Sequence, residues 1–204
     1  RPPLRRQRRD EKLRGSPQPW FAACNAWQMA PVIPGWSACC RSANAGNDDV
    51  YPTTPGTFST TVNTSQYTEG THSLSLMSTG MTTATGYDVV HGPAVYSDAF
   101  SATAGDKIYF DWRAFAGGDA FDVYGYILNT ATGATTKVLD ETGTSTGAST
   151  NWATASATIP TNGSYRFVFV AGTYDFSGGR AAGASLYIDN VRVFGSKVTD
   201  AVVT

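Results

Sequence analysis

Cysteine and histidine are both scarce in this chain, and their positions exclude several common kinds of site. The three cysteines, Cys24, Cys39 and Cys40, lack the paired spacing of a zinc site. The two histidines, His72 and His91, stand in no pattern with a serine or cysteine nucleophile. We therefore expect no zinc centre, and we predict that the protein is not an enzyme.

Long apolar runs are missing as well, and charge is unevenly spread. No run reaches the roughly 18 apolar residues that a membrane-spanning helix needs, so we expect no membrane insertion. Residues 1–42 hold eight Lys/Arg against two Asp/Glu, whereas residues 43–204 hold seven against fourteen and no cysteine. Because an acidic body opposes binding to polyanions, we expect no nucleic-acid partner.

The uneven composition also predicts how the chain is divided. The basic head, residues 1–45, differs from the rest in charge and in its use of Pro, Trp and Cys. We interpret it as disordered or non-native sequence. Residues 46–195 are interpreted as one β-sandwich module for ligand binding, and the polar ending 196–204 as a linker toward a following domain.

Short runs rich in β-forming residues, separated by Gly/Asn/Thr/Asp turns, fill the acidic body. No 3.6-residue period is evident, so the fold class that we predict is all-β, a jelly-roll-like antiparallel β-sandwich with a disordered N-terminal segment. The expected strands lie near 56–62, 73–79, 94–100, 106–115, 120–129, 135–140, 152–159, 164–171 and 184–194.

The two segments KIYFDWRAF and AFDVYGYIL each alternate an apolar face with a face of tyrosines and charges. If the AGG between them forms a hairpin, the two polar faces combine into one surface for a ligand, since tyrosine rings offer flat apolar area. An ordinary solvent-exposed face is the alternative. The hairpin register would place Arg113 opposite Asp122, Asp111 opposite Tyr124, and Tyr109 opposite Tyr126.

In the last expected strand, SLYIDNVRVF, the apolar period of two slips at Asp189-Asn190. A β-bulge there would restore the inward direction of the following residues and turn Asp189 sideways. A buried carboxylate needs a partner, which an arginine or a metal ion could supply. A plain hydrogen-bonded bulge residue is the alternative.

The turn at Glu69-Gly70, in YTEGTHSLSL, together with YIDNV in the last strand, resembles the jelly-roll modules of carbohydrate-binding and galactose-binding-like type. In those modules the two segments often share a structural calcium ion. The resemblance implies Ca²⁺ as a cofactor, with Glu69, the carbonyl region of Thr71, and Asp189 as ligands.

Longer segments, including HGPAVYSDAFSATAGDKIYFDWRA and YRFVFVAGTYDFSGGRAAGASLYIDNV, resemble a module of large repetitive bacterial adhesins that type I secretion exports. The resemblance implies a noncatalytic, calcium-dependent adhesion module, monomeric within a longer extracellular chain, that binds a glycan or a peptide on a cell surface. The alternatives are a carbohydrate-binding module of a secreted glycoside hydrolase and a structural spacer domain.

Two loops, residues 116–122 and 173–183, can meet at one rim of the sandwich if their strands run in matching directions. Like charges gathered there are unfavourable unless a cation compensates, so we expect Ca²⁺ at Asp119 and Asp175. Carboxylates dispersed in solvent are the alternative. Arg180 would hold a ligand's carboxylate by two hydrogen bonds. The complete predicted binding surface consists of Tyr109, Asp111, Arg113, Asp119, Asp122, Tyr124, Asp175 and Arg180.

Overall fold

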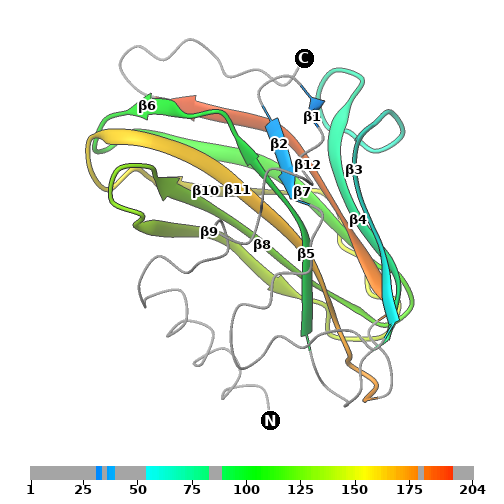
Figure 1. The fold of residues 1–204 in the computed structure, drawn as a ribbon. Coiled ribbons are helices and arrows are strands. Elements are labelled where there is room, and N and C mark those ends of the chain that lie inside the picture. Colours follow the sequence, from blue (N-terminus) through cyan, green and yellow to red (C-terminus); the bar gives the residue numbers. More distant parts are fainter. Residues whose placement is uncertain (1–30, 34–35, 40–53, 83–88, 179–181, 195–204) are drawn as a thin grey trace.

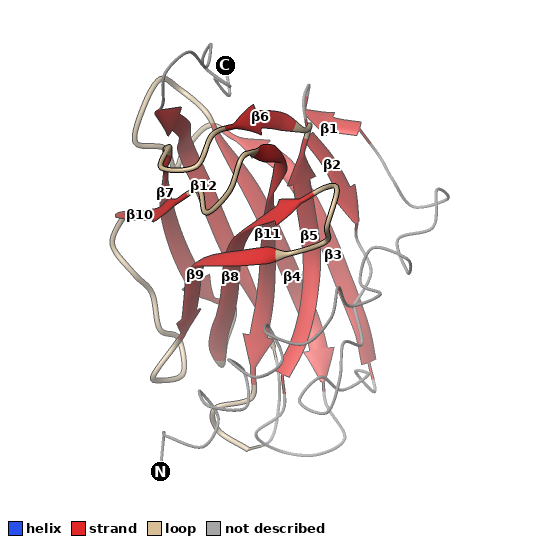
Figure 2. Ribbon diagram, turned by 90° about the vertical axis from the view of Figure 1, so that its left-hand side faces the viewer, coloured by secondary structure: helices blue, strands red, loops and turns tan. Residues whose placement is uncertain are grey.

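The computed structural model describes residues 31–33, 36–39, 54–82, 89–178 and 182–194 of the chain. The elements that they form are all strands, arranged as two antiparallel sheets (Figures 1 and 2). This confirms the predicted all-β sandwich. Among the described residues, no helix is long and apolar enough to cross a membrane.

The first sheet has seven strands and pairs segments that are far apart in the sequence. Its order is β1-β2-β5-β11-β8-β9, and β6 pairs with the end of β11. Its members are β1 (Pro31–Ile33), β2 (Trp36–Cys39), β5 (Val89–Ser97), β6 (Phe100–Ala102), β8 (Ala120–Asn129), β9 (Thr135–Thr142) and β11 (Gly163–Tyr174).

The second sheet has five strands in the order β10-β7-β12-β4-β3. Its centre is β12, which pairs with β7 on one side and β4 on the other. Its members are β3 (Thr54–Asn63), β4 (Ser73–Thr82), β7 (Lys107–Ala116), β10 (Ala153–Thr158) and β12 (Gly183–Phe194).

Every expected strand is present, but the strand expected at 94–100 has other bounds. The strand expected at 94–100 is two elements, because Ser97 interrupts the ladder: its hydroxyl accepts from the Phe167 N–H (3.0 Å). The head also contributes structure, since β2 pairs with β5. Strand pairing thus crosses the boundary that we expected at residues 45 and 46. Apart from β1 and β2, residues 1–45 lie outside the described residues, as does the expected linker 196–204.

Aromatic rings from both sheets meet in the core between the layers. Phe110 of β7 packs edge-on against Phe169 of β11, with ring centroids 4.8 Å apart. A Cβ at Gly125 of β8 would lie 2.8 Å from Phe110 Cζ, so that glycine makes room for the ring. The inward faces of β7 and β8 thus meet across the core.

This contact contradicts the expected hairpin, because β7 and β8 lie in different sheets. The connection between them, residues 117–119, is an arch: Gly117 N–H donates to the Gly183 carbonyl at the start of β12 (2.8 Å). A Cβ at Gly117 would lie 2.9 Å from that oxygen, so the arch needs glycine there. The polar faces of β7 and β8 consequently point away from each other, on opposite sides of the sandwich.

Candidate functional site

Asp189 stands at a bulge, as the slipped period predicted. The register between β12 and β7 shifts between Asp189 and Arg192, and Asn190 adopts a positive φ of 53°. Asparagine tolerates this left-handed conformation better than most residues. The bulge leaves the Asp189 side chain 3% exposed and directed at the loop between β3 and β4.

The partners of Asp189 are mainly backbone N–H groups. Its Oδ2 accepts from Thr68 N (2.6 Å), Glu69 N (2.9 Å) and Thr68 Oγ1 (3.0 Å), and its Oδ1 accepts from Asn190 N (2.7 Å). The alternative of a hydrogen-bonded bulge residue is thus the one that the geometry supports. Asp189 fastens the loop to the last strand.

Glu69 and Asp189 do lie near each other, but not as a pair of calcium ligands. The Glu69 carboxylate pairs with Arg192 (2.7 Å), and the Thr71 hydroxyl contacts His72 Nδ1 (2.7 Å). Because the Glu69 carboxylate is paired with the Arg192 guanidinium, it does not share a cation with Asp189. No group of three or more His, Cys, Asp or Glu side chains suited to a metal occurs within the described part of the chain.

Tyr109, Asp111 and Arg113 lie on the outer face of the five-stranded sheet. Asp111 accepts from Thr154 Oγ1 (2.6 Å) and Thr68 Oγ1 (2.9 Å), and Tyr109 packs edge-on against Phe194 (5.4 Å). The register predicted with Asp122, Tyr124 and Tyr126 is wrong: Asp111 pairs with Asp189 and Thr154, and Arg113 with Tyr187.

The outer face of the seven-stranded sheet carries the other half of the predicted surface, which we call the tyrosine face. Its rows are Tyr96–Val168–Tyr126–Lys137, Ala94–Val170–Tyr124–Asp140 and, toward the rim, Gly172–Asp122–Thr142. Asp122 accepts from Thr142 Oγ1 (2.6 Å) and from the Tyr124 hydroxyl (3.3 Å).

Apolar and charged groups alternate across the tyrosine face. Tyr124, Val168 and Val170 form an apolar cluster separate from the main core, and Tyr96 and Tyr126 pack against it. Burial raises the pKa of the Tyr126 phenol. Charged groups line the cluster: Lys137 pairs with Asp140 (3.0 Å), and the Arg166 guanidinium lies 5.3 Å from the centroid of the Tyr96 ring.

At the rim, the structure brings two of the predicted carboxylates together. Asp119 accepts from Ser177 Oγ (3.0 Å) and Ser177 N (3.2 Å), and Asp175 accepts from Gly178 N (2.8 Å). Both side chains are buried. Burial raises the pKa of Asp119, and the neighbouring Asp175 carboxylate raises it further, against the lowering effect of the Ser177 hydrogen bond. Asp122 has other partners, and Arg180 lies outside the described residues.

The sequence reasoning missed three aromatic residues on the two outer faces. Tyr96 joins the tyrosine face, while Phe115 and Tyr187 meet edge-on (5.7 Å) on the opposite face. Each occupies an outward position in an alternating strand. Following the alternation to the end of β7 finds Phe115, and applying it to β5 and β12 finds Tyr96 and Tyr187.

No family model matches the chain, and no curated protein does. Among solved structures, it is similar to the CBM22-1 xylan-binding domain from Paenibacillus barcinonensis, with 15% identity, 83% of this chain and 91% of that chain covered, and a TM-score of 0.42. It is also similar to the carbohydrate-binding module CBM28, specific for non-crystalline cellulose, with 13% identity, 79% of this chain and 89% of that chain covered, and a TM-score of 0.40.

A third similar structure belongs to carbohydrate-binding modules of promiscuous specificity from the β-sandwich superfamily. The identity is 13%, the TM-score is 0.41, and 80% of this chain is covered. The chain spans 58% of the length of that structure. At these TM-scores, the likenesses carry no argument about function.

Proposed function

We propose that the protein is a noncatalytic carbohydrate-binding module and that a glycan binds on the tyrosine face. The observation that carries this proposal is the set of outward rows across β5, β11, β8 and β9. In these rows tyrosines alternate with aliphatic side chains and with Asp122, Asp140 and Lys137.

The chemistry of such a face suits a sugar. The C–H side of a pyranose ring is apolar and stacks on an aromatic ring, while its hydroxyls need hydrogen-bond partners at the ring edge. Tyr96 and Tyr126, which are half-buried and lie on either side of Val168, supply the rings, and the buried Tyr124 packs beside them. Carboxylate and ammonium groups beside them supply acceptors and donors, which would orient the ligand.

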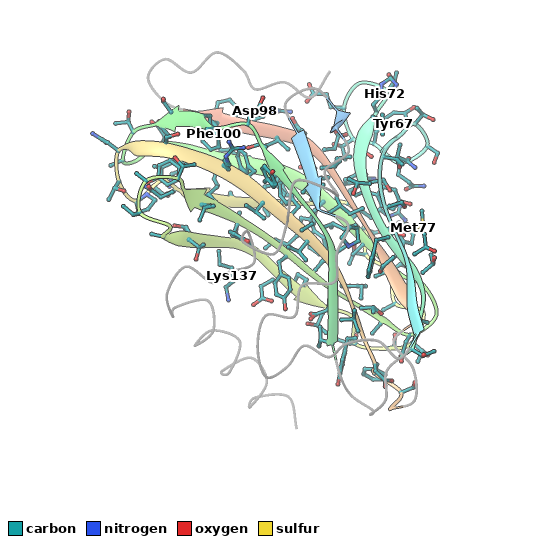
Figure 3. The ribbon with its side chains drawn as sticks, in the orientation of Figure 1. Tyr67, His72, Met77, Asp98, Phe100 and Lys137 are labelled. Carbon is teal, nitrogen blue, oxygen red and sulfur yellow. The ribbon has the colours of Figure 1, made fainter. Side chains whose placement is uncertain are left out.

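Nothing in this arrangement requires catalysis. His72 is exposed in the loop between β3 and β4, where it contacts the Thr71 hydroxyl (2.7 Å) and no carboxylate among the described residues. Figure 3 shows His72 beside Tyr67 at one edge, remote from Lys137 of the tyrosine face. We propose a binding role alone and an extracellular location, whether the parent is a hydrolase or an adhesin.

Removing the tyrosine rings tests the site. A glycan array identifies a ligand, and Tyr96→Ala and Tyr126→Ala should each weaken its binding at least about tenfold, or about 1.4 kcal/mol, as expected for a central aromatic contact. Isothermal titration calorimetry measures the loss. Tyr67→Ala is the matched control, because Tyr67 is 44% exposed in the loop between β3 and β4 and should leave affinity unchanged. Equal losses in all three variants would contradict the assignment.

For calcium, we propose the rim rather than the Asp189 loop. Two buried carboxylates that repel each other at neutral pH fit a cation, and Ca²⁺ accepts such oxygen ligands. The role of the ion would be to hold the turn after β7 against the loop after β11. Ser177, which already contacts Asp119, belongs to that loop.

Asp119→Asn should have opposite effects with and without calcium. The pKa of Asp119 is raised in the folded protein, so ionising this carboxyl group lowers the free energy of unfolding when the pH is above the raised pKa. Below the usual pKa of a carboxyl group, the residue is protonated in both states and this loss disappears. In chelator, the variant should therefore be more stable than the wild type at pH 7 but not at pH 4. With calcium at a hundred times its Kd, binding adds about 2.7 kcal/mol to the wild type. A melting temperature that does not change when calcium is added would show that the ion does not bind at the rim.

A further inference from the structure

The outer face of the five-stranded sheet, opposite the tyrosine face, carries a guanidinium between aromatic rings. Arg113 lies over the Phe115 ring, with Cζ 4.4 Å from the centroid. Tyr187 is the partner of Arg113 in the β7–β12 register, and its ring meets Phe115 edge-on at 5.7 Å. The three side chains form one continuous patch, which we call the arginine patch.

Neutral groups hold Arg113 in place. Its Nε donates to the Thr150 carbonyl (3.0 Å), and its Nη1 donates to Gln66 Oε1 (2.8 Å). These bonds come from two loops that flank the sheet, so the guanidinium is fixed before any ligand arrives. Its Nη2 makes no hydrogen bond to a described residue and remains available for an acceptor.

Arg113 forms no ion pair with a carboxylate of the described residues. Within the described ranges, the ion pairs are Lys137–Asp140 and Arg192–Glu69. Asp111, two positions along the same strand, instead accepts from Thr68, Thr154 and Asn190. A half-buried guanidinium with neutral partners is complementary to an anion, and its planar fork matches a carboxylate.

We infer that the arginine patch is a second binding site, selective for a glycan that carries a uronic acid. The carboxylate would bind the Arg113 guanidinium, and the C–H face of the sugar ring would pack against Tyr187 and Phe115. A uronic acid offers both groups on one ring. The inference rests on the proposed function for the choice of a sugar, but it uses a different face and different residues.

The test uses the full chain and a tetramer of galacturonic acid, with the methyl ester of the tetramer as the uncharged control ligand. In amide chemical-shift mapping, the acid should shift residues around Arg113, Phe115 and Tyr187, whereas the ester should not. Affinity should fall at least tenfold in Arg113→Gln and less in Arg113→Lys. Arg192→Gln is the matched control, since Arg192 lies on the same sheet and is already paired with Glu69.

The outcomes separate this inference from the proposed function. Tyr126→Ala should leave galacturonate binding unchanged while it weakens binding of the glycan to the tyrosine face. Equal affinity for acid and ester, shifts confined to the tyrosine face, or no galacturonate binding would overturn the inference and leave the proposed function standing. Because the shift map uses the unaltered chain, it decides the matter even if Arg113→Gln loosens the loops at Gln66 and Thr150.

Discussion

Asp189→Ala should destabilise the domain by about 2–3 kcal/mol, because buried donors left without an acceptor cost about 1–3 kcal/mol each. The variant would leave the N–H groups of Thr68 and Glu69 without their acceptor, whereas the Thr68 hydroxyl would keep Asp111. Both residues are themselves exposed, so water recovers part of this loss. Chemical denaturation should show the change as a lower midpoint with an unchanged slope.

The location of the effect is as informative as its size. Amide hydrogen exchange at Thr68 and Glu69 should accelerate more than exchange in β8 or β11, since Asp189 holds that loop. Asp189→Asn keeps one acceptor and should retain part of the stability. Asp98→Ala, at an exposed carboxylate, is the control and should stay within about 0.5 kcal/mol. A similar loss at Asp98 would contradict the role given to Asp189.

The sequence was sufficient to locate strands and to assign their faces. Alternation placed Phe110 and Val123 inward and Asp111 and Tyr124 outward, and the structure has all four in those positions. The slipped period at Asp189 likewise predicted the bulge. These features depend on neighbouring residues along one strand, whose side chains alternate regardless of which strand lies beside them.

Pairing between strands could not be predicted in the same way. Gly117-Gly118 suits a hairpin and an arch equally, since both need a tight turn of small residues. An apolar face on β7 and another on β8 satisfy either arrangement: side by side in one sheet, or face to face across a core. The structure has the second, with Phe110 against Gly125, and the predicted single ligand surface became two.

The rim was predictable for a different reason. The loops after β7 and β11 lie together in either pairing scheme, because β8 begins where β7 ends and pairs with β11 along its length. Asp119 and Asp175 therefore meet even though the hairpin was wrong. The ion that we propose would hold these two loops together at this end of the sandwich.

Gly183→Ala should lower the free energy of unfolding by about 3 kcal/mol or more, because steric overlap and backbone strain act together. We expect this to be the largest loss of any small substitution at this same end. An added Cβ would lie 2.8 Å from the Ser78 carbonyl carbon and 2.9 Å from Thr79 Cα. These are backbone atoms of the paired strand β4, so they cannot swing aside as a side chain could. The φ of +111° is also one that alanine rarely adopts.

The consequences should extend beyond stability, because Gly183 joins three elements. Its carbonyl accepts from Gly117 of the arch, and its N–H donates to Thr173 Oγ1 of β11 (3.2 Å). Displacing it should disturb the nearby Asp119–Asp175 pair and weaken any calcium response in thermal unfolding. Gly147→Ala isolates the contribution of strain, since Gly147 has a φ of +69° and open space around its Cβ position. That control should lower the free energy of unfolding by about 1 kcal/mol. An equal loss at both glycines would show that the contact with Ser78 does not determine the effect of Gly183→Ala.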